Sequence, residues 1–124
     1  MYVLLVEDND VIRIHLAELM TEAGFEVVGA PDAESALELA GAVRPPWVVV
    51  SDVNLGRGMD GFALANAARS RWPTVPVLLM SGVEANFAGW HCGATERFLS
   101  KPFSSDAFLQ SVADLTGKPG ALPA

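Results

Sequence analysis

The stretch WVVVSDVN, residues 47–54, consists of an apolar, mostly β-branched run, Trp47–Ser51, followed by a carboxylate and an amide. A run with no polar alternation is typical of a strand that is buried on both faces, as in a parallel sheet. Similar runs occur at Tyr2–Val6, Phe25–Ala30, Val75–Met80 and, more weakly, Arg97–Ser100. The sequence therefore predicts five parallel strands.

Segments with apolar residues at three- and four-residue intervals lie between these runs, which is the spacing of helices that bury one face. Helices are predicted from about Ile12 to Ala23, from 33 to 42 with Asp32 as cap, from 61 to 71, and from Ser104 or Ser105 to about Gly117. The segment 84–92 contains Gly89, lies between Gly82 and Gly93 and has only a loose apolar face, so it predicts only a short or distorted helix. The helical residues expected to face the core are Ile12, Leu16, Leu19, Met20, Ala23, Ala36, Leu37, Ala40, Phe62, Ala65, Ala68, Phe108, Leu109 and Val112.

Strand and helix alternate five times within 124 residues. This order predicts one α/β domain, a doubly wound five-stranded parallel sheet with helices on both faces, (βα)5. We expect the domain to span residues 1–117. Residues 118–124 (KPGALPA) are rich in Pro, Gly and Ala and are expected to form a frayed C-terminal tail.

The charge and the composition exclude several classes of function. The chain has 8 basic and 15 acidic residues, a formal net charge of −7, and no basic cluster, so direct binding to nucleic acid is not expected. The single cysteine, Cys92, cannot form an intrachain disulfide, which suits a reducing compartment. There is neither a leader pattern nor an apolar stretch of membrane-spanning length, so we expect a cytoplasmic protein that does not insert into membranes.

Polar side chains stand where the predicted strands end. They are Glu7 and Asp8 after the first strand, Asp52 and Asn54 at the third, Ser81 at the fourth and Lys101 after the fifth. Because parallel strands end at the same edge of a sheet, where open α/β sheets bind their ligands, these groups should converge. Three neighbouring carboxylates repel one another, and hard oxygen ligands suit Mg²⁺. The pattern predicts a Mg²⁺ site centred on Asp52, with Lys101 as the counter-charge.

A carboxylate that lies between a divalent cation and an ammonium group is well placed to attack phosphorus, which would give an aspartyl phosphate. Each residue also has a simpler possible role. Asp8 can cap the first helix, Asp52 or Ser81 can cap a turn, Glu7 can be a solvated strand end, and Lys101 can be a surface cation. Their joint placement at four predicted strand ends favours a shared site.

Four motifs carry a family resemblance: Val6-Glu7-Asp8, Ser51-Asp52-Val53-Asn54, Met80-Ser81-Gly82 and Ser100-Lys101-Pro102-Phe103. In this order and spacing they resemble the signature of response regulator receiver domains of two-component systems, over about Tyr2 to Leu115. The resemblance implies a flavodoxin-like fold and a phosphorylation switch. Such a domain catalyses only its own phosphorylation and dephosphorylation, so no turnover of an external substrate is expected.

The resemblance also implies a role for the acidic residues. Asp52 would accept a phosphoryl group from a phosphohistidine on a sensor histidine kinase or a histidine phosphotransfer protein. Mg²⁺ would be bound by the carboxylates of Asp8 and Asp52, by the backbone carbonyl of Asn54 and, through a water, by Glu7.

The remaining motif residues correspond to the switch of the family. Ser81 and Lys101 would each bond a phosphoryl oxygen. Phe98 stands at the position of an aromatic ring that turns inward and alters the face formed by the fourth helix, fifth strand and fifth helix. The resemblance further implies a cis Lys101-Pro102 bond and an unidentified downstream protein, and a homodimer is possible.

The sequence departs from the family pattern at three places. Residues 55–61, after the acceptor, contain glycines where the family commonly has a proline, and this loop is one residue longer, so we expect it to be mobile. The switch hydroxyl is serine where threonine is commoner. The glycine-broken segment 84–92 puts the usual output face in doubt.

The leading hypothesis is a phospho-accepting switch that relays phosphate or binds a partner. The start at Met1 and the helix-free tail favour a free-standing protein over the excised receiver of a larger one. A Mg²⁺-dependent phosphatase is a rival, but such enzymes commonly use an aspartate where this chain has Asn54. The other alternative is a degenerate receiver that binds partners without phosphate, against which the intact Asp52, Ser81 and Lys101 argue.

Overall fold

The computed structural model describes residues 2–41, 44–56, 58–82 and 96–116 of the chain. Each of the five strands lies within two residues of its predicted bounds. The elements are β1 (Tyr2–Val6), α1 (Asp10–Glu22), β2 (Glu26–Ala30), α2 (Ala33–Gly41), β3 (Val48–Asp52), α3 (Gly61–Arg71), β4 (Val77–Ser81), β5 (Glu96–Ser100) and α4 (Ser105–Thr116). The short helix predicted at 84–92 and the tail predicted at 118–124 lie outside the described residues. None of the described helices is long and apolar enough to span a lipid bilayer.

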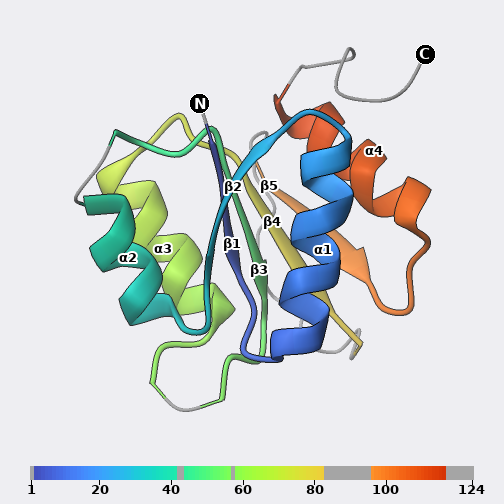
Figure 1. Ribbon diagram of the computed structural model, residues 1–124. Helices are drawn as coiled ribbons and strands as arrows, with labels where there is room; N and C mark the ends of the chain where they lie inside the picture. The colour runs from blue at the N-terminus through green and yellow to red at the C-terminus, as the bar shows by residue number, and fades with distance from the viewer. Residues whose placement is uncertain (1, 42–43, 57, 83–95, 117–124) are drawn as a thin grey trace.

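The five strands form one parallel sheet with the order β2-β1-β3-β4-β5. The chain starts in the sheet at β1, adds β2 on one side, and then crosses to β3 and continues outward on the other side. Helices α1 and α4 cover one face of the sheet, and α2 and α3 cover the other (Figure 1). The predicted flavodoxin-like, doubly wound α/β fold is confirmed. Its strand order reverses between β1 and β3, which is where such sheets bind their ligands.

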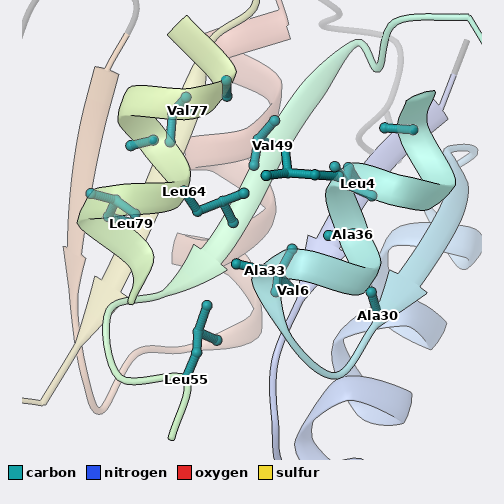
Figure 2. Close-up of a cluster of buried hydrophobic side chains, with 14 of the residues drawn as sticks. Leu4, Val6, Ala30, Ala33, Ala36, Val49, Leu55, Leu64, Val77 and Leu79 are labelled. Carbon is teal, nitrogen blue, oxygen red and sulfur yellow. The ribbon is translucent and has the colours of Figure 1, made fainter. Parts of the chain in front are cut away.

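Alternate strand residues contribute to two separate hydrophobic cores, one on each face of the sheet. Leu4 and Val6 of β1 pack with α2 and α3 in the α2/α3 core, which Figure 2 shows. Val3 and Leu5 pack with α1 and α4 in the α1/α4 core. Every residue of β1, β3 and β4 is buried, which explains why these strands show no polar alternation.

Most of the helical residues predicted to face a core are buried. They are Leu16, Met20, Ala23, Ala36, Leu37, Ala40, Ala65, Ala68, Phe108 and Val112. The prediction for Ile12 is wrong: it is 38% exposed, because the first turn of α1 borders a surface hollow and no core. On α3, Leu64 is fully buried although it was not predicted to face the core, while Phe62 is only partly buried. Leu19 and Leu109 are also partly buried, at the margin of the α1/α4 core.

The shift along α3 follows from the close approach of its first residue to β3. A Cβ at Gly61 would lie 2.4 Å from the Asp52 carbonyl oxygen, so only glycine fits there. The Gly61 N–H donates a 2.8 Å hydrogen bond to the Val53 carbonyl. With Gly61 fixed against the sheet, helical spacing turns Leu64, Ala65 and Ala68 inward.

Candidate functional site

Three carboxylates meet at the carboxyl edge of the sheet, at the point where the strand order reverses. Glu7 and Asp8 follow β1, and Asp52 is the last residue of the neighbouring strand β3. These three residues each offer a carboxylate oxygen, and the three oxygens lie within 4.8 Å of one another. The structure thus brings together the three acidic residues that the strand-end pattern singled out.

Glu7 is 1% exposed, although it carries a carboxyl group. Its Oε1 accepts a 3.4 Å hydrogen bond from the Asn9 N–H, while its buried Oε2 has no partner among the described residues. Burial, as the largest cause, and the charge of Asp52 together raise the pKa of Glu7 to about 7, although the Lys101 ammonium and the Asn9 N–H act to lower it. A buried carboxylate with an unpaired oxygen needs a proton or a cation to neutralise it, so this group suits a metal ligand.

Asp8 does not cap the first helix. Asn9 is the N-cap of α1, and its Oδ1 accepts a 3.0 Å hydrogen bond from the Ile12 N–H. The exposed Asp8 carboxylate instead lies beside the loop that follows β3, with its Oδ2 3.5 Å from the place that a Cβ would take at Gly56. The capping alternative for Asp8 is therefore wrong, and its carboxylate is available to the acidic cluster.

Lys101 brings a positive charge to the cluster. Its Nζ lies 3.1 Å from Asp52 Oδ2. The backbone N–H of Lys101 donates a 2.8 Å hydrogen bond to the Ser81 carbonyl, which extends the pairing of β5 with β4 by one residue. The Lys101-Pro102 bond is cis, in agreement with the resemblance. The Phe103 ring stacks on Phe108 at 5.6 Å between centroids, in the α1/α4 core.

The other predicted site residues lie around this centre at different depths. Ser81 is the last residue of β4, is 1% exposed, and follows Met80, the residue that pairs with Asp52. Asn54 is exposed in the loop after β3. Phe98 lies in the middle of β5 and packs, partly buried, against the α2/α3 core. Ser81 therefore belongs to the same edge as Asp52, whereas Phe98 is set back from it along β5.

Glu34, at the start of α2, was not singled out from the sequence. Its Oε2 accepts a 3.1 Å hydrogen bond from the Met59 N–H in the loop after β3. The two residues are 25 positions apart in the sequence, and no local sequence pattern predicts such a contact. The sequence feature that pointed to this loop was its pair of glycines, Gly56 and Gly58, which adopt φ angles of +74° and +85° that favour glycine.

An apolar surface lies beside the site, on the first half of α1. Val11 is 77% and Ile14 is 56% exposed. On another side of the helix, Ile12 and Leu16 line an open hollow of about 550 Å³ together with Lys101, Pro102 and Phe103. The hollow therefore reaches from α1 to the lysine that contacts Asp52.

Comparison with known proteins identifies the family. The model of the response regulator receiver domain matches residues 3–113. The chain therefore belongs to the response regulator receiver domain family, the phosphorylation-controlled modules of two-component signalling.

One relative is the response regulator protein FleR of Pseudomonas aeruginosa, which is 40% identical over 114 residues, 90% of this chain and 24% of FleR. The chain spans about a quarter to about half of the length of the curated relatives it matches.

Two solved structures support the same fold. The chemotaxis protein CheY4 of Vibrio cholerae is 33% identical, with a TM-score of 0.79 over 92% of this chain and 97% of that one. A response regulator receiver protein from Sinorhizobium medicae has a TM-score of 0.86 over 95% of both chains. At 24% identity, this second likeness concerns the fold alone.

Proposed function

We propose that Asp52 accepts a phosphoryl group from a phosphohistidine on a sensor histidine kinase or a histidine phosphotransfer protein, and that this modification switches partner binding or relays phosphate. The observation that carries the proposal is the meeting of Glu7, Asp8, Asp52 and Lys101 at one edge of the sheet. We place this activity in the cytoplasm, with an unidentified protein as the target and no turnover of an external substrate.

The acidic cluster is the proposed Mg²⁺ site. Receiver domains as a family bind Mg²⁺ at an acidic pocket, and this chain offers the carboxylates of Glu7, Asp8 and Asp52 together with the backbone carbonyl of Asn54. The buried, unpaired Oε2 of Glu7 supports the assignment, because a small hard cation would compensate its charge. The bound ion would neutralise charge on the transferring group.

The proposed transfer needs little covalent chemistry from the protein. A carboxylate oxygen of Asp52 attacks phosphorus, a P–O bond forms while the P–N bond breaks, and the electron pair returns to the imidazole nitrogen. Lys101, 3.1 Å from Asp52 Oδ2, is placed to neutralise charge on the phosphoryl oxygens. Ser81 ends β4, beside the strand of Asp52, and this position suits a hydroxyl that bonds an oxygen of the aspartyl phosphate. Phe98 is the aromatic residue that we expect to change position when Ser81 does.

The apolar surface of α1 is the proposed contact for the phosphoryl donor. Val11, Ile12 and Ile14 are exposed apolar side chains, and the hollow that Ile12 lines reaches Lys101. A protein that covers this surface would exclude water from apolar area and would bring its phosphohistidine to the edge that carries Asp52. The same contact would limit the choice of donor.

Intact mass measurement tests the proposal. With Mg²⁺ and acetyl phosphate, the wild type is expected to gain one phosphate, and Asp52→Asn is expected to gain none. Asp106→Asn, which changes an exposed aspartate of α4, is the matched control and should be labelled like the wild type. Absence of label on the wild type with any donor would favour the phosphate-independent interaction module, and sustained release of phosphate from many organic esters would favour a phosphatase.

A further inference from the structure

Glu34 reaches from the first turn of α2 to the loop that follows the acceptor strand. Besides the hydrogen bond from the Met59 N–H, its carboxylate covers the backbone of Gly58. A Cβ at Gly58 would lie 2.6 Å from Glu34 Oε2 and 3.2 Å from its Cδ. The contact therefore depends on both a carboxylate at position 34 and a glycine at position 58.

The two ends of this loop are fixed close to the acceptor. At the start, Val53 and Leu55 are each 3% exposed and belong to the α2/α3 core. At the end, the Gly61 N–H bonds the Val53 carbonyl at 2.8 Å, and Asp60 caps α3 through the Ala63 N–H. Between these ends, the Met59–Glu34 bond ties the loop to a different element of the fold.

The part of the loop that follows Leu55 borders the acidic cluster. A Cβ at Gly56 would lie 3.5 Å from Asp8 Oδ2, whereas Asn54 lies between the anchored residues Val53 and Leu55. A displacement of the loop at Met59 would therefore act on the cluster through the backbone at Gly56 and the Asp8 carboxylate beside it. The position of the loop thus affects how well the ligand set fits a cation.

We propose that Glu34 is a positioning residue of the phosphorylation site, which holds the β3–α3 loop so that its backbone at Gly56 stays beside the Asp8 carboxylate and the acidic cluster is arranged for a divalent cation. Glu34 touches no reacting atom and acts through the Met59 N–H. This inference rests on the proposed Mg²⁺ site, and it assigns a role to a residue of α2, an element that contributes no group to the chemistry.

The first test measures Mg²⁺ affinity by calorimetric titration with Mg²⁺ alone. Glu34→Ala should weaken binding by about tenfold, which is the lower end of the losses that follow changes to residues supporting a metal site from outside its ligands. Glu34→Gln should keep most of the affinity, because its amide oxygen still accepts from the Met59 N–H. Glu38→Ala removes the same charge from an exposed position on α2 and should bind like the wild type.

The second test follows amide hydrogen exchange at Met59 in the metal-free protein. Exchange should be faster in Glu34→Ala than in the wild type, and Glu34→Gln should restore protection. Gly58→Ala forces the Glu34 carboxylate away from the loop and should reproduce both effects of Glu34→Ala, even if the folded protein is less stable.

These measurements separate the failure of this inference from the failure of the proposed function. If Glu34→Ala keeps wild-type Mg²⁺ affinity and Met59 protection, the positioning role is refuted whatever the fate of Asp52. If the wild type binds Mg²⁺ and depends on Glu34, but Asp52 accepts no phosphate, the positioning role stands and the phosphorylation proposal falls. A wild type that binds no Mg²⁺ overturns the inference.

Discussion

Among the described residues, the carboxyl group of Glu7 has a strongly raised pKa of about 7. It therefore keeps its proton at pH values where an ordinary glutamate is ionised. Its neighbour Asp52 makes this effect larger, and Lys101 makes it smaller. Without a cation, the folded protein binds a proton at Glu7 that the unfolded chain has already released. The residue therefore couples folding, pH and metal binding.

The expected consequence is that the metal-free protein loses stability as the pH rises from about 4.5 to about 7. In this window the folded state holds more protons than the unfolded state, so the free energy of unfolding falls with pH, by up to about 3 kcal/mol for this shift. Glu7→Gln should remove this component. Urea unfolding at pH 5 and pH 8 measures it as the difference between wild type and variant.

The control for this prediction is Glu18→Gln, which changes an exposed glutamate of α1. Its pH profile should follow that of the wild type. If Glu7→Gln has the same profile as well, the buried carboxyl does not control the pH dependence. Asp32 affects the pH dependence of stability only at lower pH, because hydrogen bonds from Ser35 lower its pKa. It therefore does not interfere with the measurement between pH 5 and pH 8.

At the level of elements, α1 has two different sides. Leu16 and Met20 enter the α1/α4 core, while Val11, Ile12 and Ile14 are exposed, and Ile12 lines the hollow that reaches Lys101. Helical periodicity in the sequence does not separate these roles, because it reports apolar spacing and not what covers each residue. This is why the inward prediction failed at Ile12 and held at Leu16.

Ile12→Asp is expected to slow phosphorylation by a protein donor by about tenfold, since it places a charge in the apolar lining of the hollow that reaches Lys101. Labelling by acetyl phosphate should be unchanged, because a small donor does not use this surface. The comparison requires a phosphorylated histidine kinase that labels the wild type, with initial rates followed by mass. Leu39→Asp is the matched control, since Leu39 is 45% exposed on α2, across the sheet.

An equal slowing of Ile12→Asp with both donors would mean that the variant damages the site itself, and the docking role of α1 would be rejected. A wild-type rate with the kinase would reject it as well.

Whole strands and whole helices were the parts of the structure that the sequence revealed best. β1, β3 and β4 are buried on both faces, so their apolar runs stand out, whereas the partly exposed β5 produced the weakest run. The meeting of Glu7, Asp8, Asp52 and Lys101 was predictable because parallel topology alone places strand ends together. The Glu34–Met59 contact was not, since it depends on how a glycine-containing loop folds against α2.

For the molecule as a whole, Mg²⁺ binding at the strand ends should stabilise the folded state. With Mg²⁺ at a hundred times its Kd, the free energy of unfolding should rise by about 2.7 kcal/mol, because the unfolded chain lacks the assembled cluster. Asp8→Asn should lose most of this gain. Denaturant unfolding with and without Mg²⁺ measures both values.

Asp106→Asn separates site binding from general screening of the net charge of −7, because it removes the same charge from an exposed residue that is not part of the cluster. It should retain the full gain. Should Asp8→Asn gain as much stability as the wild type, the ion acts elsewhere on the protein.

The Asp52–Lys101 contact joins two segments that are anchored on opposite sides of the sheet. The residues after Asp52, Val53 and Leu55, are fixed in the α2/α3 core, whereas Phe103, just after Lys101, stacks in the α1/α4 core. A small sliding of one helical layer past the other would therefore stretch or compress this single ion pair. The distance between Lys101 Nζ and Asp52 Oδ2 therefore depends on how the two helical layers are positioned relative to each other. A shift in the NMR signal of the Lys101 ammonium on partner binding would report a change in that position.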